Sequence, residues 1–124
     1  MCSSYAWDTA IKFIQTHSTA INYGKDGFNE NWLDKEVKDK NGNIIKKANE
    51  AVRLKTGLTT SKANIYDMGG NVREFTTEIN PNTSEAIILR GGCYLEHSSA
   101  GTRFDTNFSN SESHWGIRAT LFIL

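Results

Sequence analysis

Residues 64–76 have the sequence Asn64-Ile65-Tyr66-Asp67-Met68-Gly69-Gly70-Asn71-Val72-Arg73-Glu74-Phe75-Thr76. The glycine pair permits positive φ or a close backbone approach, and the residues after it alternate as in a strand. The stretch therefore predicts a sharply bent loop that continues as a strand. Asp67 and Glu74 place carboxylates on either side of the bend, and a bent backbone also turns carbonyl oxygens inward. Such oxygens are the ligands that a hard cation such as calcium requires.

Residues 64–76 resemble the core signature of the formylglycine-generating enzyme and sulfatase-modifying-factor family, written N-x-x-D-M-x-G-N-V-W-E-W-T. Two more blocks follow in the family's order and spacing: Leu89-Arg90-Gly91-Gly92 with an aromatic residue at Tyr94, and Gly116-Ile117-Arg118-Ala119. The resemblance extends from Asn64 to Leu124 and implies an α+β domain with the family's C-type lectin-like fold. The first residues look like the family helix with Trp7 at its tryptophan position, which implies a domain shortened at its N-terminus.

The three sequence blocks resemble non-catalytic bacterial and phage members of this fold more than they resemble its enzymes. The non-catalytic members include the variable proteins of diversity-generating retroelements, which carry R-G-G-x, a diversified loop rich in asparagine and serine, and then G-F-R-A-x-L. Here the corresponding ending is Gly116-Ile117-Arg118-Ala119-Thr120-Leu121. The resemblance implies a phage or bacterial binding module, for which a virion or cell surface would be a suitable location within a larger protein.

Length and charge limit the number of domains and the kinds of partner that the chain can have. The 124 residues suit one domain, residues 1–124. The 14 lysines and arginines balance the 14 aspartates and glutamates, so no nucleic-acid partner is expected, because that affinity comes mainly from net basic contacts. No apolar run approaches the roughly 20 residues of a membrane span, and no signal peptide is visible. The sequence leaves open whether Cys2 and Cys93 form a disulfide, and nothing in it supports that pairing.

Hydrophobic periodicity predicts a first helix over Met1–Gln15. Ser3 or Ser4 can accept hydrogen bonds from its first turn, and Asp8 suits the positive end of the helix dipole. The predicted buried stripe consists of Trp7, Ala10, Ile11 and Ile14.

A small, charged and solvated hairpin is predicted over Trp32–Lys47. Its centre is Asn41-Gly42, because both central residues of a type I′ turn need positive φ. The remaining predicted elements are a short helical turn in Ala48–Leu58, a surface turn in Glu78–Glu85, a buried strand over Ala86–Leu89 and a final buried strand over Ile117–Leu124.

The residues argue against the chemistry of the family's enzymes. The resemblance implies that such enzymes bind copper with two cysteines after R-G-G, and these positions fall on Glu96 and Gly101. Cys93 lies three positions too early, and one thiol cannot supply the paired soft ligands that Cu(I) prefers. The three histidines, His17, His97 and His114, have no recognisable ligand spacing. We therefore expect no copper and no enzyme activity, with an atypical oxidoreductase as the alternative.

The resemblance also implies a calcium site. Carried over residue by residue, its ligands are Asp67, Gly70, Val72 and Glu74, with backbone carbonyls from Gly70 and Val72. The alternative is that backbone amides or Arg118 hold Glu74 with no ion present. Both alternatives remain open at the level of sequence.

Cys93–Trp115, here called the excursion, is long, polar and rich in aromatic residues. Such connections are uncommon unless functional, and aromatic residues mixed with serine, asparagine and glycine are typical of binding surfaces. We expect a protein or cell-surface ligand, with a purely structural domain of a larger assembly as the alternative. Phe104 and Trp115 are expected to point inward, whereas Tyr94, Glu96, His97, Asn107 and Asn110 should share one exposed face. The candidate ligand-binding residues are Tyr94, Glu96, His97, Arg103, Asp105, Asn107, Phe108, Asn110 and His114.

Overall fold

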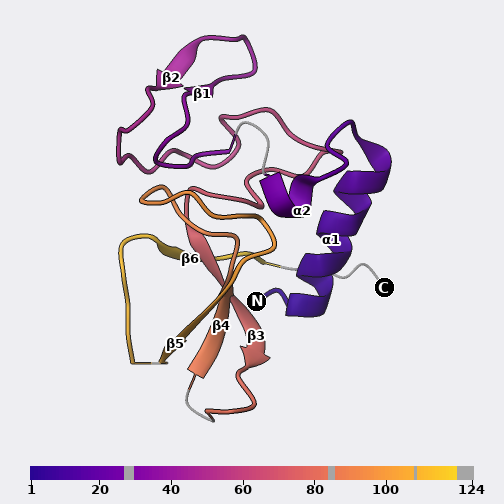
Figure 1. Cartoon of the computed structure of the whole chain (residues 1–124), viewed down its shortest axis with the longest axis vertical. Helices are drawn as coiled ribbons and strands as arrows, with labels where there is room; N and C mark the ends of the chain where they lie inside the picture. Colours follow the sequence, from indigo (N-terminus) through magenta and orange to yellow (C-terminus); the bar gives the residue numbers. More distant parts are fainter. Residues whose placement is uncertain (27–29, 84–85, 108, 120–124) are drawn as a thin grey trace.

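The computed structural model of the chain describes residues 1–26, 30–83, 86–107 and 109–119. One helix and one mixed sheet dominate it, with a separate two-stranded hairpin at the end opposite the β3–β4 turn (Figure 1). The sheet has the order β5-β4-β3-β6, in which β6 runs parallel to β3 and the other pairs are antiparallel. This arrangement confirms the α+β class. The elements are α1 (Ser4–His17), α2 (Tyr23–Asp26), β1 (Val37–Lys38), β2 (Ile44–Lys46), β3 (Arg73–Ile79), β4 (Ala86–Arg90), β5 (Arg103–Asn107) and β6 (Trp115–Ile117).

Helix α1 forms where the periodicity predicts it. The Ser3 hydroxyl caps it by accepting a hydrogen bond from the backbone N–H of Ala6 at 3.1 Å. The predicted stripe is buried at three positions, Trp7, Ile11 and Ile14, while Ala10 is partly buried. None of the described helices is long and apolar enough to cross a membrane.

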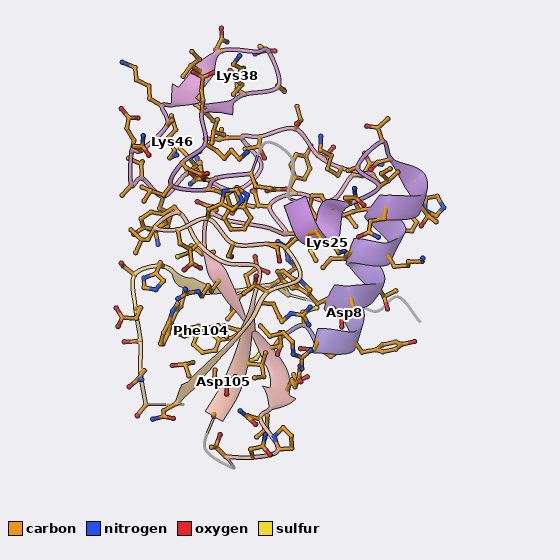
Figure 2. All side chains as sticks on the ribbon, viewed as in Figure 1. Asp8, Lys25, Lys38, Lys46, Phe104 and Asp105 are labelled. Carbon is orange, nitrogen blue, oxygen red and sulfur yellow. The ribbon has the colours of Figure 1, made fainter. Side chains whose placement is uncertain are left out.

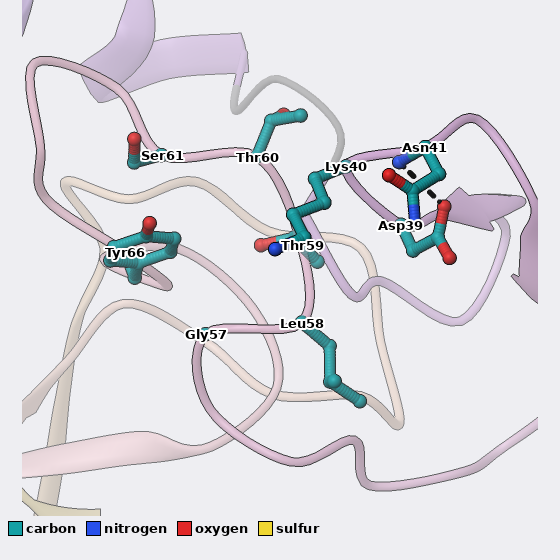
Figure 3. Close-up of a pocket in the computed structure, with 9 residues that line it drawn as sticks. All are labelled: Asp39, Lys40, Asn41, Gly57, Leu58, Thr59, Thr60, Ser61 and Tyr66. Atoms are coloured by element: carbon teal, nitrogen blue, oxygen red, sulfur yellow. Dashed lines mark hydrogen bonds between the residues drawn. The ribbon is translucent and has the colours of Figure 1, made fainter.

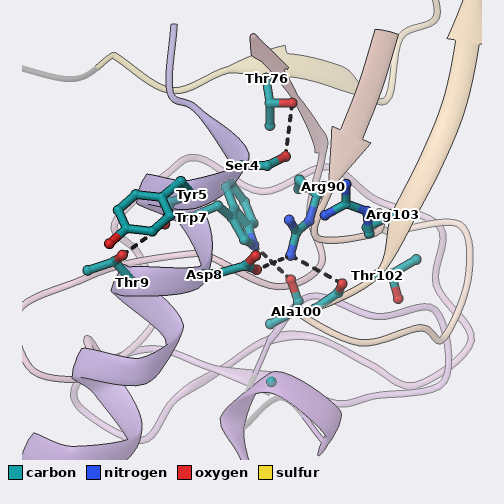
Figure 4. Close-up of polar contacts among 12 residues, drawn as sticks. Ser4, Tyr5, Trp7, Asp8, Thr9, Thr76, Arg90, Ala100, Thr102 and Arg103 are labelled. Atoms are coloured by element: carbon teal, nitrogen blue, oxygen red, sulfur yellow. Dashed lines mark hydrogen bonds and ion pairs between the residues drawn. The ribbon is translucent and has the colours of Figure 1, made fainter. Parts of the chain in front are cut away.

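Polar contacts join α1 to one face of the sheet (Figure 4). The Ser4 hydroxyl donates to Thr76 Oγ1 at 3.3 Å, and Arg90 Nη2 lies 2.5 Å from Asp8 Oδ1. Asp8 lies beyond the first turn of α1. Its principal partner is therefore this arginine, and the prediction that it serves the helix dipole is wrong.

Two glycines in the left-handed conformation bring the residue 64–76 loop against the end of β4. Gly70 has a φ of 67° and Gly91 a φ of 92°, and the Gly70 N–H donates to the Gly91 carbonyl at 2.7 Å. A Cβ on Gly91 would lie 2.6 Å from the Met68 carbonyl and 2.8 Å from the Trp7 ring. Only glycine satisfies both the conformation and the space at this joint.

The predicted hairpin is present, but its turn differs from type I′. Gly42 has a φ of 85°, whereas Asn41 does not have a positive φ. The Asp39 carboxylate shapes the turn instead, because its Oδ1 accepts hydrogen bonds from the backbone N–H groups of Asn41 at 2.8 Å and Asn43 at 2.9 Å.

The hairpin is also less solvated than predicted. Val37 is fully buried, and Lys46 is only 2% exposed. The Lys46 ammonium donates to the carbonyls of Trp32 at 2.7 Å, Leu33 at 3.3 Å and Lys35 at 2.7 Å. Burial lowers the pKa of Lys46, while these carbonyls satisfy its donors. This lysine therefore ties the hairpin to the preceding chain and does not serve solubility.

Further differences lie in the connections and at the sheet edges. Residues 48–58 contain no helix but have hydrogen-bonded turns at both ends, with the Glu50 N–H donating to the Lys47 carbonyl and the Leu58 N–H to the Lys55 carbonyl, each at 3.4 Å. β6 pairs with β3 as an edge strand, and Ile117 is 73% exposed; its predicted burial is wrong. Leu121 lies outside the described residues. The predicted buried strand at 86–89 is confirmed, because every residue of β4 is buried.

Candidate functional site

The excursion is held to the rest of the domain at buried positions. Cys93, Ala100 and Thr106 are all buried. Trp7 Nε1 donates to the Ala100 carbonyl at 2.9 Å (Figure 4), and the Gly101 N–H donates to the Gly24 carbonyl at 3.0 Å. These contacts fix the middle of the excursion against both helices.

Most of the candidate ligand-binding residues lie on the surface. Tyr94, Glu96 and His114 are half-buried, and Phe108 lies outside the described residues. The candidates on the exposed surface are His97, Arg103, Asp105, Asn107 and Asn110. The excursion also contains β5, which pairs antiparallel with β4 over its whole length, although the sequence predicts no regular element there.

Arg73 organises one part of this surface, which we call the Arg73 cluster (Arg73, Glu96, Phe104 and His114). Arg73 Nη2 lies 2.8 Å from Glu96 Oε2, and Nη1 lies 3.4 Å from His114 Nε2. Its Cζ stands 4.1 Å from the centroid of the Phe104 ring, a cation–π distance. Arg73 is the residue that sequence reasoning missed. The available signal was its replacement of the family's tryptophan in the signature.

The side chains of two further candidates, Arg103 and Asp105, lie on the face of the sheet opposite to Arg73. Phe104 and Asp105, both labelled in Figure 2, are neighbours on β5, so their side chains alternate between faces. Arg103 pairs with Glu78, and Asp105 accepts from the Asn80 amide. Phe104 is on the face of Arg73 but remains exposed, so its predicted inward position is wrong, while Trp115 is partly buried.

His97 belongs to neither group. Its Nδ1 lies 2.7 Å from Asp34 Oδ2, and its ring stacks on Trp32 with centroids 5.8 Å apart. Although partial desolvation acts the other way, the hydrogen bond and charge of His97 lower the pKa of Asp34. The structure thus divides the single face predicted from the sequence into separate groups.

Glu74 and Arg118 form a bidentate ion pair beside the residue 64–76 loop. Arg118 Nε donates to Glu74 Oε2 at 2.7 Å, and Nη2 donates to Oε1 at 2.9 Å. Nη2 also donates to the carbonyls of Tyr66 at 3.1 Å and Asp67 at 2.9 Å. Burial raises the pKa of Glu74, and the Arg118 charge opposes that shift.

Both carboxylates among the predicted calcium ligands already have partners within the protein. The Asp67 carboxylate accepts from the Gly57 N–H and the Thr59 hydroxyl, each at 2.9 Å. Glu74 already faces the Arg118 guanidinium, which a divalent cation would have to displace. No group of three or more histidine, cysteine or acidic residues suited to a metal occurs in the described part of the chain. The residues therefore fit the Arg118 alternative better than a calcium ion.

The cysteines are separate and inaccessible. Cys2 and Cys93 are both free and buried, and burial raises the pKa of the Cys93 thiol. A thiol in this state is a poor nucleophile and a poor metal ligand, because both roles need the thiolate.

A family model described as the sulfatase-modifying factor enzyme 1-like domain matches residues 2–121. The chain belongs to this family. No curated protein and no solved structure gives a significant match. In this sulfatase-modifying factor family member, the excursion carries Glu96 and Gly101 at the two positions onto which the resemblance of the sequence blocks carries over the copper-binding cysteines of the family's enzymes.

For this family member we predict that thermal stability does not respond to calcium. A bound ion would stabilise the folded state by about 2.7 kcal/mol at a concentration about a hundred times the dissociation constant. Melting temperatures with calcium and with a chelator should coincide, because Arg118 already satisfies Glu74. A calcium-dependent rise that disappears in Glu74→Gln would show instead that the ion displaces Arg118.

Proposed function

We propose that this domain is a non-catalytic binding module that presents the excursion to a protein or cell-surface ligand. Within the family it would stand near the phage and bacterial members with a C-type lectin-like fold, including the variable proteins of diversity-generating retroelements. The block Gly116-Ile117-Arg118-Ala119 and the asparagine- and serine-rich segment before it support this relationship. A reverse transcriptase gene and a near-copy of the coding sequence for the excursion in the neighbouring DNA would test the retroelement link.

The observation that carries the proposal is that the excursion contains two kinds of residue, buried ones that anchor it to the scaffold and exposed ones on the surface. Its buried residues, Cys93, Ala100 and Thr106, hold it to the scaffold, and the Trp7 side chain and Gly24 backbone bind its middle. Between these points the polar side chains are exposed or half-buried, and the ion pairs of His97 with Asp34 and of Arg103 with Glu78 lie at the surface. A binding surface needs this separation, because its contact residues can then change without unfolding the domain.

The exposed chemistry suits a polar macromolecular partner. The Arg73 cluster offers the exposed Phe104 ring, whose centroid lies 4.1 Å from Arg73 Cζ. Arginine and aromatic residues are the types that contribute most of the energy at protein interfaces. The neighbouring histidine and asparagines supply adaptable hydrogen bonds.

The main test compares substitutions at exposed and anchoring positions. The triple variant His97→Ala, Asn107→Ala, Asn110→Ala should keep its unfolding free energy within about 0.5 kcal/mol per site. By contrast, Ile88→Ala, in fully buried β4, should cost about 2–5 kcal/mol. Urea denaturation followed by tryptophan fluorescence measures both.

The same variants test binding. Fluorescently labelled wild-type protein is mixed with a panel of bacterial cells and counted by flow cytometry. Lys12→Ala, on an exposed position of α1, is the matched control and should bind as wild type does. The triple variant should lose binding while remaining folded. Equal binding by the triple variant, or its unfolding, would contradict the proposal.

A separate prediction concerns catalysis. Without paired thiols at positions 96 and 101, the protein should not oxidise a cysteine peptide in the presence of Cu(I). Mass spectrometry of a sulfatase-type peptide should show no aldehyde product. Turnover that disappears in Cys93→Ser would establish the atypical oxidoreductase alternative and refute the non-catalytic proposal.

A further inference from the structure

A polar cleft opens between the hairpin turn and the loop that precedes residues 64–76 (Figure 3). Its volume is about 530 Å³, within the range of roughly 300–1,000 Å³ typical of small-molecule sites. Tyr66 and Ser61 stand at one end, and Asp39 and Asn41 at the other, with Lys40 and Thr59 between them. None of these residues belongs to the excursion, so the cleft is independent of the proposed binding surface.

Several groups in the cleft are available to a ligand. The Ser61 hydroxyl, the Lys40 ammonium and the Tyr66 hydroxyl have no hydrogen-bond or ion-pair partner among the described residues. The Tyr66 side chain is 40% exposed, so its ring can receive a flat apolar surface. The Asp39 oxygens are held by the turn at 2.8–3.1 Å and retain lone pairs that can accept further hydrogen bonds.

The loop that carries Tyr66 is held in an unusual conformation. Ala63, Asn64 and Asp67 all have positive φ, at 50°, 64° and 51°, a region that non-glycine residues rarely adopt. Reciprocal backbone hydrogen bonds between Lys62 and Ile65, both 2.9 Å, close this loop. Such strained conformations persist only where the surroundings enforce them, and they concentrate at functional sites.

The wall of the cleft is fixed as well. Thr59 is buried and donates to Asp67 Oδ1 at 2.9 Å, and the Gly57 N–H donates to Asp67 Oδ2 at 2.9 Å. These bonds join residues 57–59 to the residue 64–76 loop, which carries Tyr66, so this side of the cleft is held in place. A ligand would therefore meet a largely preformed site, which reduces the ordering that binding requires.

The lining selects a chemical class of ligand. An apolar ligand would leave hydroxyl and charged groups unpaired, which is unfavourable. A phosphate or other anion would meet one ammonium at Lys40, no arginine, and the opposing carboxylate of Asp39. A neutral molecule with many hydroxyls and an apolar ring face satisfies the aromatic ring, the donors and the acceptors together.

We propose that this cleft binds a neutral saccharide, with the apolar face of the sugar ring on Tyr66 and its hydroxyls on Ser61, Lys40 and Asp39. The sugar can be free or part of a glycan, since both present the same ring. The ring of Tyr66 supplies contact area, and the polar groups set the orientation.

Saturation-transfer NMR on the full chain tests this proposal. The probes are methyl α-D-mannopyranoside, methyl β-D-glucopyranoside, methyl β-D-galactopyranoside and N-acetylglucosamine, each at millimolar concentration. At least one should receive saturation from wild-type protein. Tyr66→Ala should lose that signal, Ser61→Ala should weaken it, and Tyr66→Phe should retain most of it.

Tyr5→Ala is the matched control, because Tyr5 is an exposed tyrosine on α1, 85% exposed, and should leave the signal unchanged. Circular dichroism confirms that each variant is folded. Absence of transfer to all four glycosides, or transfer that persists in Tyr66→Ala, would overturn the proposal. Amide shifts at residues 57–61 caused by inorganic phosphate and not by the glycosides would also overturn it. Each of these outcomes is distinguishable from failure of the excursion to bind cells.

Discussion

Gly91→Ala should leave the protein unfolded or severely destabilised. The residue has a φ of 92°, and a left-handed or related conformation costs a non-glycine residue about 1–3 kcal/mol. The new Cβ would also lie 2.6 Å from the Met68 carbonyl and 2.8 Å from the buried Trp7 ring. Overpacking of this kind adds about 1–3 kcal/mol, so the sum is a large part of the 5–15 kcal/mol typical of a domain.

Gly42→Ala separates the two contributions. Gly42 has a similar φ of 85°, but a Cβ there would meet nothing within 4 Å. It should therefore show the conformational cost alone, about 1–3 kcal/mol. Urea denaturation of both variants gives the difference, which measures the close packing of the β4 end against α1. Equal destabilisation by the two substitutions would show that the joint can relax around a methyl group.

The sequence predicts elements whose partners follow from local periodicity. The stripe of Trp7, Ile11 and Ile14 has helical spacing, and an amphipathic helix needs only some apolar surface to cover it. The run 86–89 is apolar at every position, which predicts burial on both faces, and β4 is one of the two central strands of the sheet. The three family blocks predicted the family that the domain match established.

The failures concern residues whose environment is set by distant segments. Lys46 has the composition of a surface residue, yet it is buried because three carbonyls from residues 32–35 surround its ammonium. Ile117 has the composition of a core residue, yet it is exposed because β6 lies at an edge of the sheet. Periodicity contains no information about which carbonyls approach a side chain or which strand ends the sheet.

The candidate sites show the same limit. Composition correctly located exposed polar residues in the excursion, such as Asn107 and Asn110. It could not show that Arg73, outside the excursion, would hold Glu96 and His114. For the residue 64–76 loop, the sequence left calcium and Arg118 as alternatives, because choosing between them requires the position of the guanidinium.

Arg118→Met should be among the most destabilising substitutions outside the apolar core. It removes both hydrogen bonds to Glu74, two hydrogen bonds to backbone carbonyls, and a cation–π contact 5.7 Å from the Trp7 ring. The Glu74 side chain is only 9% exposed, and an uncompensated buried charge costs about 3–5 kcal/mol. Arg103→Met is the matched control. Its pair with Glu78 is more exposed, and such pairs contribute about 0–1 kcal/mol.

Two further measurements attribute the loss to the charge of Glu74. Burial raises the pKa of Glu74 and Arg118 lowers it, so without Arg118 the folded-state pKa should rise well above the unfolded value of about 4.3. A raised carboxyl pKa means that the folded state binds the proton more tightly, and stability falls as pH rises between the two values. The destabilisation by Arg118→Met should therefore be smaller near about pH 4 than near about pH 8.

The double variant Glu74→Leu, Arg118→Met should recover part of the loss at the higher pH, because replacing a buried pair with apolar residues is often neutral. A loss that is independent of pH and fully additive in the double variant would show that Arg118 acts through its packing on Trp7 and its carbonyl contacts alone.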